Sequence, residues 1–355
     1  MKRFTQWGND LYTGETSIGF VRRRNTWFII GIVLICLSVA SPFLRGGFNF
    51  GIEFTGGSEF QVSAPTTQDQ ALATEDAAAY SETPARVQLL GDGSIRVQTD
   101  TLTQEENNAL RADLAESYGT TVEHVAVSTI GPSWGADITR QMVIGIIVFL
   151  VLAAALMSFY FRTWKMAVAA ILALVHDLIV TAGVYALTGV EITPAAVIGF
   201  LTILGYSLYD TVVVFDKVRE NTKNYGPGSA RTFAESVNLA INQTLVRSIN
   251  TSVVALLPVM AILFIGAFVM GAGTLRDISL ALFIGILVGA LSTIFLAGPL
   301  YSALRAREPK IRETDAEIRR RRDAGIEPDA EPEHEDDDAD GEPARPEREN
   351  DGAQV

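Results

Sequence analysis

The sequence holds one cysteine and three histidines among 355 residues, and this scarcity excludes several kinds of site. Cys36 stands alone in an apolar run, so an intramolecular disulfide framework is impossible. His124 is the only histidine of residues 45–137 and has no second ligand at metal spacing, so we expect no metal or catalytic role for it. A phosphate-binding loop is also missing, because the strand context of a nucleotide fingerprint does not accompany Gly266, Gly271 and Gly273. The sequence therefore predicts no enzyme, no cofactor and no metal.

Positive charge is scarce as well, with 28 Lys and Arg against 41 Asp and Glu and a net charge of −13. The imbalance lies almost wholly in residues 323–355, which hold 14 acidic and two basic residues together with four prolines. Such a segment is too poor in apolar residues to bury a core. We therefore interpret residues 304–355 as a cytoplasmic acidic disordered tail. Its end either solvates the protein or binds a soluble partner, and we favour solvation.

Hydrophobic residues are abundant, at 48% of the chain with a mean hydropathy of +0.24, which favours a membrane protein. A spanning helix needs about 20 apolar residues because its backbone must satisfy its own hydrogen bonds in lipid. The first apolar run lacks a small-x-small cleavage site at its end, so we interpret it as a retained anchor rather than a signal peptide. The six predicted spans are Trp27 to Leu44, Ile138 to Phe161, Met166 to Leu187, Pro194 to Phe215, Leu245 to Met270 and Ile278 to Leu300.

Lysine and arginine in the short loops set the predicted orientation. One side holds many of them, and the opposite short loops hold only Arg276. This asymmetry places residues 1–26 and both termini in the cytoplasm of a multi-pass cell-membrane protein. The predicted layout is span one at 27–44, an outward-facing domain at 45–137, the remaining spans within 138–303 around a cytoplasmic loop at 216–244, and the last span at 278–300.

The outward segment alternates between strand and helix patterns. We expect strands at Ser58 to Ala64, Ala85 to Leu90, Ser94 to Thr99 and Thr121 to Thr129, with helices at Gln68 to Tyr80 and Gln104 to Tyr118. The order βαββαβ is the ferredoxin-like arrangement, which many unrelated proteins share. The predicted fold class is therefore an α-helical membrane protein with six transmembrane helices and an outward α+β ferredoxin-like domain between the first two.

A glycine-rich stretch joins the first span to this domain. Its adjacent glycines permit a tight turn near the membrane surface, so we predict a joint there. The residues of the predicted joint are Gly51, Glu53, Phe54, Gly56 and Gly57.

Ionisable side chains within the spans are the candidates for function, because they are costly in lipid. Asp210 in the fourth span has small residues upstream for a neighbouring helix, so we expect it to face the bundle interior. Arg247 begins the fifth apolar run, with Thr251 four residues later on the same face. An arginine beside the aspartate favours the anion and burial favours the acid, so small movements could load or release a proton. The alternative is a buried ion pair that only fixes helix register.

These motifs together resemble the SecF family of protein-export subunits, relatives of the resistance-nodulation-division transporters. The resemblance is carried by the glycine-rich stretch at 50–57, by the Asp-Thr-Val-Val-Val-Phe-Asp run at 210–216, and by His176 with Asp177 in the third span. Tyr209 stands where many members have asparagine, which leaves open the hydrogen-bond partner of Asp210. The acidic tail is not explained by the resemblance.

The resemblance implies a subunit that uses the proton motive force to promote preprotein translocation across the cytoplasmic membrane. It implies a SecD-like partner, the SecYEG channel, a preprotein substrate and membrane lipid as partners, and no nucleic acid. It also assigns proton conduction to Asp210 and Arg247, while His176 and Asp177 serve either the relay or a helix contact. The alternatives are half of a small-molecule or lipid exporter and a non-transporting assembly factor of the channel.

Overall fold

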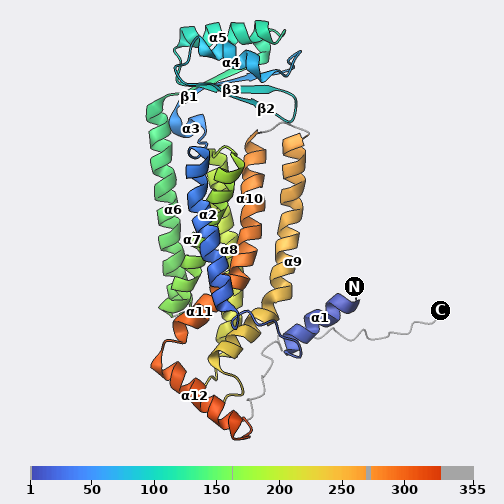
Figure 1. The fold of residues 1–355 in the computed structure, drawn as a ribbon, viewed down its shortest axis with the longest axis vertical. Coiled ribbons are helices and arrows are strands. Elements are labelled where there is room, and N and C mark those ends of the chain that lie inside the picture. Colours follow the sequence, from blue (N-terminus) through green and yellow to red (C-terminus); the bar gives the residue numbers. More distant parts are fainter. Residues whose placement is uncertain (1, 162, 269–272, 329–355) are drawn as a thin grey trace, which may run out of the picture.

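Six long helices form a bundle with a small sheet domain at one end, as Figure 1 shows for the computed structural model. The structure describes residues 2–161, 163–268 and 273–328. In this part of the chain, six helical segments are long and apolar enough to span a membrane. They are α2 (Arg24–Arg45), α6 (Pro132–Phe161), α7 (Trp164–Thr188), α8 (Pro194–Asn221), α9 (Phe233–Phe268) and α10 (Gly273–Ser292), the last continued by a π-helical turn (Thr293–Ala297) and α11 (Gly298–Arg305). The protein is thus a multi-pass helical membrane protein.

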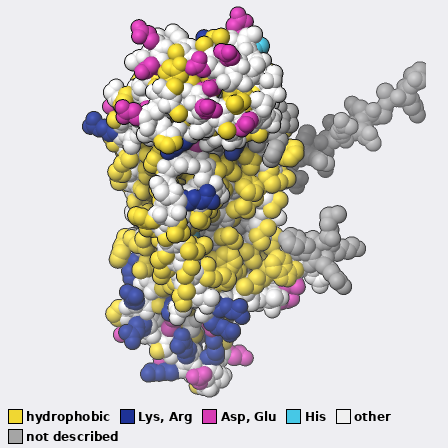
Figure 2. Space-filling view, turned by 45° about the horizontal axis from the view of Figure 1, so that its top comes forward, with side chains coloured by type: hydrophobic (Ala, Val, Ile, Leu, Met, Phe, Trp, Pro, Cys, Tyr) yellow, Lys and Arg dark blue, Asp and Glu magenta, His cyan; other side chains and the backbone are white. Residues whose placement is uncertain are grey.

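The centre of the bundle is formed by α7, α8 and α10, which bury far more of their surface than α2, α6 and α9. Small residues allow the close approach of α8 and α10: a Cβ on Gly285 would lie 2.5 Å from Ile203, and one on Gly199 would lie 2.6 Å from the Cβ of Ala281. The outer helices expose apolar side chains, which form the yellow band around the middle of Figure 2. This band fits a lipid surface or a partner in the membrane.

Local signals explain where α8 begins. Thr193 is its N-cap, with extended backbone and a side-chain oxygen that accepts a hydrogen bond from the backbone N–H of Ala196. Pro194 follows at the first helical turn, where a missing N–H costs nothing. The start of α8 is therefore fixed by its own sequence, at the residue predicted from hydropathy.

The sheet domain lies between α2 and α6 and has the element order βαββαβ. Its strands and helices are β1 (Gly57–Val62), α4 (Gln70–Ala78), β2 (Arg86–Leu89), β3 (Ile95–Thr99), α5 (Gln104–Ser117) and β4 (Val125–Ile130). The antiparallel sheet has the strand order β2-β3-β1-β4, with Phe60 of β1 opposite Val97 of β3 and Val127 of β4. Helices α4 and α5 cover the face that points away from the bundle (Figure 1).

Alternation along the strands divides the sheet into two faces. Phe60, Ile95 and Val97 are fully buried in a core with residues of α4 and α5. The residues between them, including Glu59, Arg96 and Gln98, point to the other face, toward the bundle. The domain therefore has a complete apolar core of its own and presents a polar face to the spans.

The structure adds elements that hydropathy did not predict. The prediction that residues 304–355 are disordered was wrong for the first part of this segment. There, α11 runs to Arg305 and α12 occupies Pro309–Asp323. The overall acidity and prolines of the tail hid this helix, in which Ile311 and Ile318 are buried one heptad apart. The most acidic part of the predicted tail, residues 329–355, lies outside the described residues. The N-terminal segment also contains a helix, α1 (Lys2–Thr13).

The self-contained core predicts that a fragment from Gly57 to Gly131 folds alone in water. Circular dichroism should show mixed helix and strand with a cooperative thermal transition. Phe60→Ala should destabilise the fragment by about 3–5 kcal/mol because its ring is fully buried. Val127→Ala, at a side chain that is 37% exposed, is the matched control with a small effect. A random-coil spectrum for the unmodified fragment would contradict the prediction.

Candidate functional site

Asp210 lies on α8 against α9 and is only 4% exposed. The hydroxyl of Ser248 on α9 donates a hydrogen bond of 2.8 Å to its Oδ1. Its Oδ2 is buried and has no hydrogen-bond partner among the described residues. A buried carboxylate oxygen without a donor is costly, whereas a protonated carboxyl group reduces that cost. Asp210 therefore occupies a place where a proton can be held between two helices.

Arg247 lies on α9, one residue before the serine that bonds to Asp210, but it does not form an ion pair with Asp210. Its Nη2 donates a hydrogen bond of 3.3 Å to the hydroxyl of Tyr209, and both side chains are exposed on the surface of the single chain. Within the described residues, no ion pair joins Arg247 to Asp210. Thr251 donates to the backbone carbonyl of Arg247 at 2.8 Å rather than contacting its guanidinium. The residue next to Arg247, Ser248, takes the place beside the aspartate that the sequence suggested for the arginine.

Asp177 on α7 is the second buried carboxylate, and it is fully satisfied. Its Oδ2 accepts hydrogen bonds from Ser207 on α8 at 2.7 Å and from Ser292 on α10 at 2.8 Å, while its Oδ1 lies 3.2 Å from Nδ1 of His176. The carboxylate thus ties three helices together. His176 lies against α2, and its Nε2 has no partner in the described part of the chain.

Three serines complete these two sites, and sequence reasoning did not assign them a role. In the sequence, Ser207 is one of the small residues upstream of Asp210, and Ser248 and Ser292 lie in apolar stretches where serine gives no periodic signal. Their positions on neighbouring helices bring them to the carboxylates, which is a tertiary effect. A usable signal was that buried acids in spans require donors on facing helices.

The predicted joint contains a short helix, α3 (Ile52–Thr55), followed by two glycines in conformations that other residues rarely adopt. Gly56 has φ of 77° and Gly57 has φ of 148°, and a Cβ on Gly57 would lie 2.6 Å from the carbonyl oxygen of Thr99. Phe54 is buried in one apolar cluster with Tyr185 and Phe200 of the bundle. The joint is thus a tight turn anchored in the spans.

The loop between α7 and α8 carries a further buried acid that the sequence did not single out. Glu191 is 7% exposed and accepts a hydrogen bond of 2.7 Å from Nε2 of Gln98 on β3. Burial raises the pKa of its carboxyl group above the ordinary value, although Gln98 and Arg96 act in the opposite direction. Glu53 of the joint also has its pKa raised by burial.

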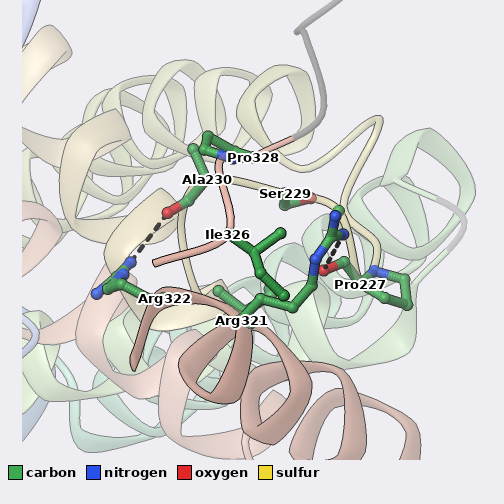
Figure 3. A pocket seen from close by; sticks show the side chains of 9 residues that line it. Pro227, Ser229, Ala230, Arg321, Arg322, Ile326 and Pro328 are labelled. Carbon is green, nitrogen blue, oxygen red and sulfur yellow. Dashed lines mark hydrogen bonds between the residues drawn. The ribbon is translucent and has the colours of Figure 1, made fainter. Parts of the chain in front are cut away.

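Two cavities lie at the end of the bundle opposite the sheet domain. The smaller, of about 50 Å³, lies between α12 and the loop before α9. Figure 3 shows Arg321 and Arg322 bonded there to the backbone carbonyls of Pro227 and Ala230, with Ile326 between them. The larger, of about 710 Å³, is lined mainly by polar residues of α1, α8, α9 and the loop. The smaller one is a docking contact for α12, because its arginines are bonded to the protein itself.

These features define a class: a membrane protein of six spans with an α+β domain inserted after the first span and buried acids between central helices. The chain matches the family model for "Protein export membrane protein SecD/SecF, C-terminal" over residues 111–307, and the "SecD/SecF GG Motif" over residues 44–64. It belongs to the SecD/SecF family of protein-export membrane proteins, which confirms the resemblance seen in the sequence.

Relatives extend the match over most of the chain. It is 42% identical to protein translocase subunit SecF of Streptomyces coelicolor, covering 92% of this chain and 87% of that protein. It is also 42% identical to SecF of Mycobacterium tuberculosis, covering 89% and 73%. The crystal structure of SecDF from Thermus thermophilus superimposes with a TM-score of 0.72 at 33% identity. The match covers 82% of this chain but only 39% of that one, so the present chain spans well under half of the SecDF protein.

The geometry around Asp177 predicts a stability effect. Removing both donors by Ser207→Ala and Ser292→Ala leaves a fully buried carboxylate oxygen without a partner, which should cost about 1–3 kcal/mol. Thermal unfolding of the purified protein in detergent should therefore shift to lower temperature. Thr202→Ala is the matched control, because its exposed hydroxyl bonds only to the carbonyl of Ile198. An equal midpoint for the double variant and this control would refute the proposed tie.

Proposed function

We propose that this chain is a SecF-type accessory subunit of the Sec protein translocase, which uses the proton motive force together with a SecD-like partner to promote preprotein translocation. The observation that carries the proposal is the buried, half-satisfied carboxylate of Asp210 between α8 and α9. An ionisable group inside a span marks a functional site by default, because its burial must be compensated. Asp177 has donors at both oxygens and serves mainly as a helix contact, with His176 beside it.

The partner docks on the exposed polar surface of α8 and α9. Tyr209, Arg247 and Asn250 are exposed there, although both helices are spans. A guanidinium in contact with lipid inside a span is costly, so a second membrane protein must cover this surface. The SecDF relative combines the names SecD and SecF in one longer chain, which supports a SecD-like chain as the protein that covers this surface. Movement of this partner would carry Arg247 toward or away from Asp210 and so change its proton affinity.

The orientation follows from the distribution of charge. Lys and Arg gather at the end of the bundle opposite the sheet domain, as Figure 2 shows in dark blue. The positive-inside rule then places both termini, α1 and α12 in the cytoplasm and the sheet domain outside. Its βαββαβ order with strand order β2-β3-β1-β4 supports a ferredoxin-like domain in that position. There it would contact the preprotein as it leaves the SecYEG channel.

Replacing the acid tests the proton role directly. Asp210→Asn keeps the shape and the bond from Ser248 but cannot titrate, so proton-gradient-dependent export in membrane vesicles should fall to the level of vesicles that lack the chain. Arg247→Met should also lower it, since the charge that modulates the aspartate is lost. Asp216→Asn is the matched control on the same helix, because Asp216 is bonded to Tyr160 at the edge of the bundle.

A double variant with apolar residues at Asp210 and Arg247 distinguishes a role in proton transport from a purely structural role. If Asp210 only holds α8 against α9, an apolar residue in its place should be tolerated, because a buried polar contact is often no more stable than a well-packed apolar substitute. Full gradient-dependent export in the double variant, at equal membrane abundance, would contradict the relay role of these residues. The function would then be that of an assembly factor.

Truncation after Pro328 should leave export nearly unchanged. The truncated chain keeps α12 and the contacts of Arg322 with Glu235, while the removed residues carry the composition of a solvated segment. The measurement is export from cells that hold equal amounts of full-length and truncated chain. A loss as large as that of the whole-chain deletion would make the tail a working part.

A further inference from the structure

The polar face of the sheet contacts the bundle at the loop between α7 and α8. On β3, Arg96 and Gln98 point toward the bundle, since Ile95 and Val97 fill the core on the other face. Gln98 donates from Nε2 to Oε1 of Glu191 at 2.7 Å and to Oε2 of Glu59 at 2.8 Å. Arg96 lies 3.4 Å from Glu191 and 3.6 Å from Glu59. One carboxylate of the bundle and one of the domain therefore share the same two donors.

The loop that carries Glu191 is tied to the joint and to two central helices. Ile192 pairs with Phe50 in a parallel bridge, and its carbonyl accepts from the N–H of Gly51 at 3.0 Å. Thr193, the N-cap of α8, donates its hydroxyl to Asp277 of α10 at 2.9 Å. Glu191 thus stands two residues before the cap of the helix that bears Asp210, with no flexible segment between them.

Acidic side chains outnumber basic ones around this contact. Four carboxylates, those of Glu53, Glu59, Glu191 and Asp277, act on the cluster, and Arg96 is the basic side chain that pairs with two of them. A Cβ on Gly273 would lie 2.7 Å from Nη2 of Arg96, so the guanidinium also lies close to the start of α10. A small shift of α8 or α10 therefore changes the distance from Arg96 to its acceptors.

We propose that Glu191 is the positioning residue that couples α8 to the outward domain, and that its contact with Arg96 and Gln98 opens and closes as the domain moves. The inference rests on the proposed function, because it assigns to Glu191 the transmission of the change at Asp210.

The test measures the domain position in the full-length chain with its partner in proteoliposomes. Spin labels at Glu123→Cys on the domain and Leu187→Cys at the end of α7, in a Cys36→Ser background, report the distance between domain and bundle; all three native side chains are exposed. In the otherwise unmodified chain, a proton gradient should shift the distance distribution. Glu191→Ala should lower the ratio of docked to undocked domain roughly tenfold and abolish the response to the gradient.

Two further variants guard against a folding defect. Glu191→Gln keeps an acceptor for Gln98 but loses the attraction to Arg96, so its effect should be intermediate. Gln98→Leu removes the donor from the domain side and should reproduce the loss. Glu105→Gln, at an exposed position of α5, is the matched control and should behave as the unmodified chain.

The outcomes separate this inference from the proposed function. If Asp210→Asn stops export while Glu191→Ala keeps both export and the gradient-dependent shift, the coupling role is overturned and the proton role stands. If Asp210→Asn exports fully, the proposed function fails. A Glu191→Ala domain that is undocked yet still responds to the gradient would make the contact a static anchor and also overturn the inference.

Discussion

A carboxylate buried between spans must receive hydrogen bonds from neighbouring groups, and this structure depends on that constraint. Asp177 receives them from hydroxyl groups of α8 and α10 and from a neighbouring histidine, and so holds the central helices together. Asp210 satisfies this constraint only in part, with one donor from α9. The two acids lie on adjacent helices and differ in the number of donors that they receive, and the proposed function assigns the proton to Asp210, which has fewer. In the proposed function, a SecD-like partner covers the exposed arginine beside Tyr209.

The energy of moving a charge across the membrane is similar in size to that of the contact between the bundle and the domain. Moving one charge through 100 mV is worth about 2.3 kcal/mol. A hydrogen bond to a charged group contributes about 1.5–3 kcal/mol. The contact of Glu191 with Arg96 and Gln98 is therefore weak enough for one or a few protons to open it, provided that α8 moves as a unit. Its capped start and its bonds to α7 and α10 favour such rigid movement.

Much of the fold could be predicted from the sequence, because spans and alternating strands leave periodic signals. The start of α8 at Pro194 and the first three strands were predicted closely, since Thr193 with Pro194 and the turn at Gly93 act locally. The last strand begins at Val125 rather than at Thr121, because a short 3-10 helix at Val122–His124 precedes it. The break in the last span was missed: a π-helical turn at Thr293–Ala297 widens it where Thr293 meets Thr211 of α8. Asp210 could be singled out by its charge in an apolar run. Ser248, Ser292 and Glu191 could not, because only the packing of helices and domain brings them to their partners.

The most direct test of the account is infrared difference spectroscopy of the complex in lipid, recorded as the pH is changed. The account predicts a carboxyl C=O band that appears on acidification, disappears in Asp210→Asn, and shifts when Ser248→Ala removes the donor to Oδ1. A carboxyl band unchanged by Asp210→Asn would show that this residue does not take up a proton, and would contradict the central claim.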